Sequence, residues 1–182
     1  MSTLVLPDPS LVVIVGAAGS GKSTLAARLF AAGEILSSDA LRAAVSGNEA
    51  DQSASAVAFR ILHSTLQRRM GNGQLTVVDA TNTKSEHRRP LLTRARAAGI
   101  PVVAIVLDLP PDLIHAQNAT RSRRVVEPAI VDRHIAAVRR TIDDGRLATE
   151  GFDHVVILHG SDDVQILQIR RHARSTLTGP GP

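Results

Sequence analysis

A glycine-rich segment near the N-terminus constrains the fold of this chain more than any other feature of its sequence. Residues 11–15 form a continuous apolar, β-branched run, which predicts a strand buried on both faces. Residues 16–23 follow with the sequence Gly-Ala-Ala-Gly-Ser-Gly-Lys-Ser, and residues 22–32 have the pattern of a helix that ends at Gly33. A buried strand, a glycine turn and a helix N-terminus in this order predict an α/β unit with a phosphate-binding loop.

This loop carries the residue types needed to bind a nucleoside triphosphate. Its glycines let the backbone approach the phosphates closely, with N–H groups pointing inward. Lys22 is expected to reach the β- and γ-phosphates, and the Ser23 hydroxyl is expected to bind Mg²⁺. We therefore predict binding of ATP, or of GTP or another nucleoside triphosphate, with Mg²⁺. The predicted nucleotide contacts are Gly16, Ala17, Ala18, Gly19, Ser20, Gly21, Lys22, Ser23 and Thr24.

Strands and helices alternate along the rest of the chain. Further strands are predicted at residues 35–36, 75–79, 101–107 and 154–158. Helices are predicted at residues 39–45, 53–70, 85–98, 111–120, 128–147 and 161–175. Strands separated by helices predict one α/β domain, residues 10–176, with a parallel five-stranded sheet and helices on both faces. Prolines near both ends predict a flexible N-terminus at residues 1–9 and a flexible tail at residues 177–182.

Composition excludes several classes of function. The 182 residues include no cysteine, which rules out disulfides, cysteine-ligated zinc, iron–sulfur clusters and thiol nucleophiles. No apolar run approaches the roughly 20 residues that span a bilayer, and no signal peptide is visible. We therefore expect a cytoplasmic protein with no membrane partner. Three phenylalanines without tryptophan or tyrosine argue against an extended platform for stacking nucleic acid bases.

The positive charge of the chain comes almost entirely from arginine. Only Lys22 and Lys84 among the 21 basic residues are lysines, and the net charge is +4. Arginine binds phosphate through a planar, two-pronged fork, so an arginine-rich surface suits a polyanionic partner. A codon-usage bias toward arginine explains the same composition equally well, and charge alone does not define a function.

A carboxylate and an arginine follow the predicted second strand, at the sheet edge where the phosphates are expected. Asp39 is therefore placed to accept a proton from an attacking hydroxyl. Arg42 comes three residues later on the same helical face, so the pair suits an acceptor that carries a phosphate. The alternative is that Ser38 or Asp39 caps the helix and Arg42 forms a surface ion pair.

Two more groups of charged residues have both a functional and a structural interpretation. Asp79 ends the predicted third strand, where its carboxylate could bind Mg²⁺ through water. The alternative is a turn in which the Asp79 side chain only forms hydrogen bonds with the backbone. Arg121, Arg123 and Arg124 lie within residues 112–148, which we expect to form a helical lid over the nucleotide. Arginines on a lid stabilise the charge of a transferred phosphoryl group, and the alternative is a solvated basic turn.

Several ordered motifs of this chain match those of one known enzyme family. They lie at residues 16–24, 37–39 with Arg42, 51–53, 75–82, 118–124, 131–134 and 150–152. The resemblance extends over residues 11–158 and rests on these motifs. This part of the chain resembles the 5′-kinase module of bacterial polynucleotide kinase-phosphatase and, more distantly, phage-type 5′-polynucleotide kinases. The resemblance implies a P-loop kinase-like fold and transfer of the ATP γ-phosphate to the 5′-hydroxyl of DNA or RNA.

The resemblance also implies roles for single residues. Asp39 matches the general base, and Arg42 matches the residue that holds the acceptor's 3′-phosphate. Arg121 and Arg124 match arginines that serve the nucleotide phosphates from the lid, so Lys22, Asp39 and Arg121 are the expected catalytic residues. The other matched positions on the substrate side are Gln52 and Arg88.

The chain departs from the family at Ala18, where serine is common, and at Gln117, where arginine is usual. Neither change removes a reacting group. The phosphatase and ligase modules are absent, so we expect a stand-alone or excised kinase. Separate phosphatase or ligase partners are possible for such a kinase, and so is a homo-oligomer. Two other functions also stay open: a small-molecule P-loop kinase acting on a sugar, nucleotide or antibiotic hydroxyl, and a regulatory nucleotide-binding ATPase.

Overall fold

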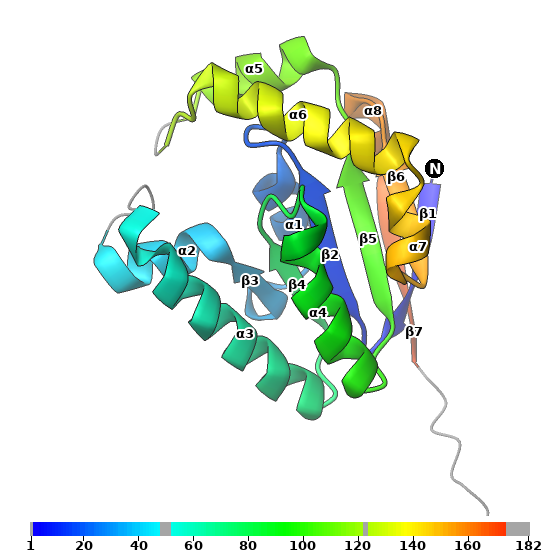
Figure 1. Ribbon diagram of the computed structural model, residues 1–182. Coiled ribbons are helices and arrows are strands. Elements are labelled where there is room, and N and C mark those ends of the chain that lie inside the picture. The colour runs from blue at the N-terminus through cyan, green and yellow to red at the C-terminus, as the bar shows by residue number, and fades with distance from the viewer. Residues whose placement is uncertain (1, 48–51, 122–123, 174–182) are drawn as a thin grey trace, which may run out of the picture.

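A central parallel sheet organises the molecule. The computed structural model describes residues 2–47, 52–121 and 124–173 (Figure 1). Five strands form the sheet in the order β3-β4-β2-β5-β6, and every neighbouring pair is parallel. The strands are β2 Leu11–Gly16, β3 Ile35–Ser37, β4 Thr76–Asp79, β5 Val102–Leu107 and β6 His154–Leu158. The predicted α/β fold with a parallel five-stranded sheet is confirmed.

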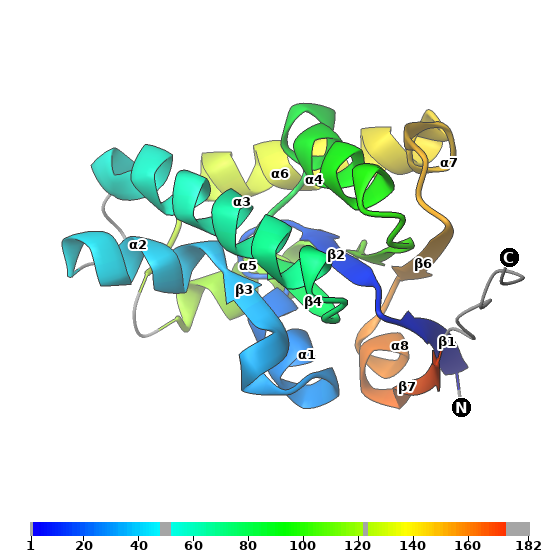
Figure 2. The same ribbon diagram turned by 90° about the horizontal axis from the view of Figure 1, so that it is seen from below.

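Helices connect the strands and cover both faces of the sheet (Figure 2). They are α1 Lys22–Leu29, α2 Ser38–Ser46, α3 Ser55–Gly71, α4 Ser85–Ala97, α5 Pro111–Ala119, α6 Pro128–Asp143, α7 Arg146–Glu150 and α8 Ser161–Ile166, with 3₁₀ turns η1 Ala32–Glu34 and η2 Gln52–Ala54. Among the helices of the described residues, none combines the length and the apolar character that crossing a membrane requires.

Two apolar cores lie on the two faces of the sheet. Val12 and Ile14 of β2 pack in one core with Leu25 of α1, and the alternate residues of β2 pack in the other core with α3 and α4. Successive side chains of a strand point to opposite faces, so a strand with helices on both sides must be apolar throughout. The long helix α6 contributes to both cores, through Val131 on one face and Val138 on the other.

The two ends of the domain form a second, small sheet. β1 Ser2–Asp8 pairs in parallel with β7 Leu167–Ala173. Leu4 and Leu6 are 8% and 0% exposed and belong to the same core as α1. The predicted flexible N-terminus at residues 1–9 is therefore wrong for the strand residues, because alternate side chains anchor them in the core.

The C-terminal part also differs from the prediction of a helix over residues 161–175. α8 ends at Ile166, and β7 follows at once. Leu167 is fully buried and Ile169 packs against the same core, so burial alternates with the period of a strand. The helix prediction failed because the partner strand comes from the other end of the chain. The predicted flexible tail at residues 177–182 lies outside the described residues.

Two helices differ in detail from the sequence pattern. The predicted helix at residues 128–147 is interrupted after Asp143, where Gly145 adopts a φ of 62° and α7 begins. In α3, Val57 and Ile61 fit the apolar spacing but are 36% and 38% exposed. The core-facing residues of α3 are instead Ala58, Leu62, Leu66 and Met70.

Candidate active site

The phosphate loop joins β2 to α1 at the carboxyl edge of the sheet. Gly19 and Gly21 adopt φ values of 85° and 84°, which favour glycine over any residue with a side chain. A Cβ atom at Gly19 would lie 2.7 Å from the Asn118 Cβ and 2.8 Å from the Ile114 carbonyl oxygen. The loop conformation and its close approach to α5 therefore both require glycine at this position.

A pocket of about 810 Å³ opens over this loop. The described residues that line it come from the loop, α1, α2, α3, the end of β4 and the turn after it, α4, the segment after β5, the lid segment and α8. Within the described part of the chain, the buried oxygens Ser20 Oγ and Gln117 Oε1 have no hydrogen-bond partner. Both residues line the pocket, and polar atoms that are buried without partners favour a polar ligand there. Of the predicted nucleotide contacts, Gly16 and Ala17 do not line the pocket, whose lining begins at Ala18.

Lys22 is buried at the floor of the pocket. Its Nζ donates a hydrogen bond of 2.7 Å to the carbonyl of Ala17. Burial lowers the pKa of Lys22 from 10.5 to about 8, the Asp79 carboxylate partly opposes this, and Arg121 adds to the lowering. Burial removes the water that would stabilise the charged ammonium group of Lys22. A phosphate in the pocket would stabilise that charge instead.

Ser23 and Asp79 bring two oxygen ligands together at the start of α1. The Ser23 hydroxyl donates to Asp79 Oδ2 at 2.7 Å, and Asp79 is buried at the end of β4. Oxygen ligands beside a phosphate site suit Mg²⁺, which keeps several waters and shares the phosphate oxygens. These residues therefore fit the predicted ion, and bound Mg²⁺ would neutralise charge on the phosphates.

The turn after β4 is held against the phosphate loop. The backbone N–H of Gly16 donates to the Thr81 carbonyl at 3.0 Å, and Asn82 Nδ2 donates to the Ile14 carbonyl at 2.8 Å. Asn82 has a φ of 46°, a left-handed conformation that asparagine tolerates. These contacts fix the position of Asp79 relative to Ser23.

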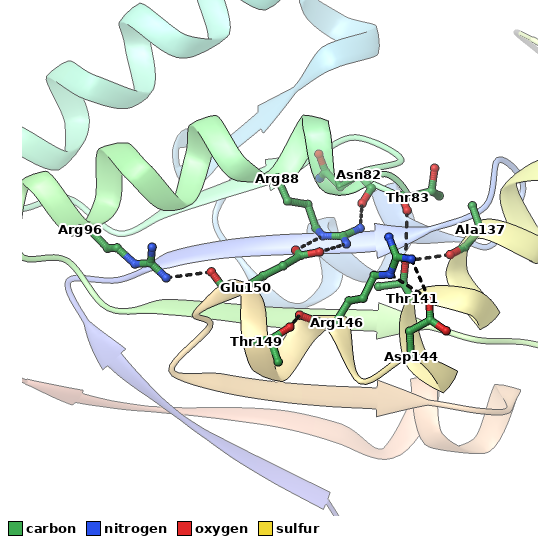
Figure 3. A network of polar contacts seen from close by, with 10 residues as sticks. All are labelled: Asn82, Thr83, Arg88, Arg96, Ala137, Thr141, Asp144, Arg146, Thr149 and Glu150. Carbon is green, nitrogen blue, oxygen red and sulfur yellow. Dashed lines mark hydrogen bonds and ion pairs between the residues drawn. The ribbon is translucent and has the colours of Figure 1, made fainter.

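Arg88 contacts this turn and α7 (Figure 3). This position differs from the predicted contact of Arg88 with the substrate. Its side chain is fully buried, is not part of the pocket lining, and donates to both carboxylate oxygens of Glu150. Its third contact is a hydrogen bond of 2.8 Å to the Asn82 carbonyl. Since the guanidinium is occupied by α7 and by the turn, we assign Arg88 a positioning role instead.

The Arg88–Glu150 pair leads to a stability prediction. Glu150→Ala is expected to lower the free energy of unfolding by about 3–5 kcal/mol, because it leaves the buried Arg88 charge without its counter-ion. Asp144→Ala removes the nearby exposed pair with Arg146, shown in the same view, and is expected to cost about 1 kcal/mol or less. Urea unfolding followed by far-ultraviolet circular dichroism measures both costs. Equal costs would show that the buried pair does not hold α7 against the turn.

Asp39 lies at the mouth of the pocket, in the first turn of α2. Arg42 forms an ion pair with it, and Arg121 Nη2 and Arg124 Nη1 lie 4.0 and 3.9 Å from its carboxylate oxygens. The helix cap is Ser37, whose hydroxyl accepts a hydrogen bond from a backbone N–H of the first turn. The alternative in which Ser38 or Asp39 caps the helix is therefore wrong. The one-third-exposed Asp39 carboxylate faces the pocket among cations from α2 and from the lid.

Asn118 ties the lid segment together. Its Nδ2 donates to the Val126 carbonyl at 2.7 Å, and its Oδ1 accepts from the Val126 N–H at 3.1 Å. These two bonds close the connection between α5 and α6, on which Arg121 and Arg124 lie beside Asp39. The side chain of Gln52 and residue Arg123 fall outside the described residues, so the predictions for them stay predictions.

Sequence reasoning did not single out His134. His134 lines the pocket, and its Nδ1 accepts a long hydrogen bond of 3.5 Å from the Ala18 N–H. Burial, and then Lys22 and neighbouring arginines, lower the pKa of His134 to about 4, so the ring is neutral. The signal was present in residues 131–134, one of the matched segments. Other lining residues that sequence reasoning did not single out include Ser55, Phe59, Ser161 and Gln165.

The phosphate loop leads into a helix at the carboxyl edge of a parallel sheet and carries a buried lysine and a serine–aspartate pair. These features define a P-loop domain of the kinase-like class. Residues 11–144 match the sequence profile of a family described as an AAA domain, and the chain belongs to that family. No curated protein sequence matches the chain.

Several solved structures have a similar fold. The chain is similar to a chain of the Pnkp1/Rnl/Hen1 RNA repair complex, with 17% identity, a TM-score of 0.64 and coverage of 77% of this chain and 47% of that chain. It is similar to a chain of AvrRxo1-ORF1:-ORF2 with ATP, with 16% identity, a TM-score of 0.67 and coverage of 84% and 55%. A gluconokinase from Sinorhizobium meliloti has 14% identity, a TM-score of 0.54 and coverage of 88% and 87%. At these identities the likeness shows the fold alone.

Proposed function

We propose that this protein is an ATP-dependent polynucleotide 5′-hydroxyl kinase. The observation that carries the proposal is the Asp39 carboxylate, which lies in the same pocket as the phosphate loop and among Arg42, Arg121 and Arg124. A base for a hydroxyl and cations for phosphates therefore share one cavity with the nucleotide site. This arrangement is what transfer of a phosphoryl group to an alcohol requires.

In the proposed reaction, Asp39 takes the proton of the acceptor's 5′-hydroxyl. The hydroxyl oxygen forms a bond to the γ-phosphorus while the bond from that phosphorus to the β–γ bridging oxygen breaks, and ADP leaves. Lys22 and Arg121 stabilise the negative charge that spreads over the transferred group. Arg124 adds positive charge from the lid side of the same pocket.

Arg42 supports a nucleic acid end as the acceptor. It lies next to Asp39 and is almost fully buried, so its fork is held near the hydroxyl that reacts. In a nucleic acid end, the phosphate on the 3′ side of the first nucleoside lies one sugar away from the 5′-hydroxyl. The likeness in fold to a chain of an RNA repair complex agrees with this acceptor, and it also agrees with separate repair enzymes as partners.

A small-molecule kinase is the second candidate, favoured by the similar fold of a gluconokinase. It would use the same loop, base and lid on a different hydroxyl. A regulatory ATPase would hydrolyse ATP without an acceptor and would not need Asp39 as a base.

The role of Arg42 is tested with a nucleoside 3′-monophosphate and the same nucleoside without phosphate. The 3′-monophosphate is expected to be the better acceptor by about ten- to a hundredfold in kcat/KM, the size of one charge-assisted contact to phosphate. Arg42→Ala is expected to erase this preference by lowering kcat/KM for the good acceptor only. Arg60→Ala, an exposed arginine on α3, is the matched control and should keep the preference.

Equal kcat/KM values for the two acceptors with the wild-type protein would remove the nucleic acid assignment. A sugar or antibiotic that outcompetes every oligonucleotide would favour the small-molecule kinase. Hydrolysis of ATP with no product on any acceptor would favour the regulatory ATPase.

A further inference from the structure

A second, smaller pocket adjoins the nucleotide pocket between α3 and α4. Its volume is about 230 Å³, and Leu62, Val78 and Leu91 give it an apolar wall. Phe59, Asn82 and His87 line both pockets, so the small pocket opens beside the cavity that contains Asp39. This volume is below the range of pockets for drug-sized ligands and leaves room for one ring system.

One face of α3 leads from the large pocket into the small one. Ser55, Phe59 and His63 are spaced by four residues and therefore share this face. Ser55 lines the large pocket, Phe59 lines both, and His63 lines the small one. Within residues 2–47, 52–121 and 124–173, Ser55 Oγ and His63 Nδ1 are buried without a hydrogen-bond partner. Buried polar atoms normally have hydrogen-bond partners. This face of α3 therefore suits a ligand with an apolar ring whose polar edge supplies those partners.

Phe59 offers an aromatic surface on which the ring of a ligand could stack, near the pocket that contains Asp39. The chain has three phenylalanines and no tryptophan or tyrosine. Phe30 and Phe152 are 5% and 9% exposed and belong to the cores, whereas Phe59 is half-buried at the junction of the two pockets. Burial lowers the pKa of His63 and of His87 on the opposite wall, which favours the neutral imidazole, a form that can both donate and accept hydrogen bonds.

We propose that the small pocket binds the terminal nucleobase of the acceptor, stacked on Phe59 and hydrogen-bonded at its edge by His63. This inference rests on the proposed function, since it names the part of the acceptor that lies next to the reacting hydroxyl. A single stacking site needs one aromatic residue and is compatible with the low aromatic content of the chain.

The test compares two oligonucleotides that differ only at the 5′ end. One begins with an ordinary nucleoside, and the other begins with a tetrahydrofuran abasic residue that keeps the 5′-hydroxyl and the 3′-phosphate. The wild-type protein is expected to phosphorylate the abasic acceptor with a kcat/KM about ten- to a hundredfold lower, the size of one base–aromatic stack. Phe59→Leu is expected to lower kcat/KM for the base-bearing acceptor toward that of the abasic one, whose own value stays unchanged. Ile61→Leu, at an exposed position of the same helix, is the control and should keep the wild-type ratio.

The outcomes separate this inference from the proposed function. Equal kcat/KM values for the two acceptors with the wild-type protein would overturn the nucleobase pocket and leave the kinase proposal intact. No product with either acceptor would overturn both. An increase in the KM for ATP in Phe59→Leu, with the acceptor ratio kept, would assign the pocket to the donor base and overturn the proposal.

A second variant keeps the proposal testable if Phe59→Leu does not fold. His63→Gln is expected to change the order of kcat/KM among oligonucleotides that begin with A, C, G or U, because it alters the group that contacts the edge of the base. The abasic acceptor is expected to be unaffected by this change. An unchanged order would overturn the role of His63.

Discussion

Asp39→Asn is expected to lower the rate of phosphoryl transfer by about 10²- to 10⁴-fold, the usual contribution of a general base. Asparagine keeps the shape of the side chain but cannot accept the proton of the hydroxyl. Nucleotide binding is expected to persist, because the phosphate loop and Lys22 are unchanged. Transfer of labelled γ-phosphate to a 5′-hydroxyl oligonucleotide measures the rate, and titration calorimetry measures nucleotide affinity.

The control for this variant is Asp143→Asn, on an exposed position near the end of α6 and outside the pocket lining. It should transfer phosphate at the wild-type rate. A loss of less than tenfold in Asp39→Asn, with ATP affinity intact, would mean that Asp39 serves only as the ion-pair partner of Arg42.

Lys22→Ala is expected to weaken ATP binding by about ten- to a hundredfold and to lower the rate of transfer by about 10²- to 10³-fold. The lysine supplies positive charge at the floor of the pocket, where burial makes an uncompensated charge unfavourable. A phosphate provides that compensation, so the contact should strengthen as charge develops on the transferred group. Because burial disfavours the charged lysine, removing it is expected to leave the protein folded.

The other lysine of the chain is a matched control for this experiment. Lys84 is 64% exposed, pairs with Glu86 at the surface and lies outside the pocket lining. Lys84→Ala should leave ATP affinity and transfer unchanged. Bound nucleotide can be followed by its ultraviolet absorbance, since the chain has no tryptophan or tyrosine. A wild-type protein that binds neither ATP nor GTP with Mg²⁺ would contradict the assignment of the phosphate loop.

The phosphate loop and the strands of the main sheet could be predicted because their signals are local. The glycines of residues 16–21, the lysine and the serine act within one turn, and neighbouring residues alone make the strand and helix that flank them. Buried strands appear as apolar runs whatever their order in the sheet. The sequence therefore determined the fold class, and it also identified the phosphate loop and several other residues that line the pocket.

Other features depend on segments far apart in the chain. β1 and β7 each have too few apolar residues to be recognised alone, and they became strands because they pair with each other and bury Leu4, Leu6 and Leu167. The positions of Phe59 and His134 in the pocket depend on where α3 and α6 pack against the sheet. No periodicity within either helix contains that information.

Arg88 illustrates the same division for a single residue. Its place after the turn of β4 suits a residue that binds substrate and equally a residue that supports the turn. Only the packing of α7, which brings Glu150 to a buried guanidinium, decided between the two roles. Helix, strand and turn preferences arise between near neighbours and can be recognised from a sequence. Burial and charge pairing arise between distant segments, so only the tertiary structure determined which arginines face the pocket and which hold it together.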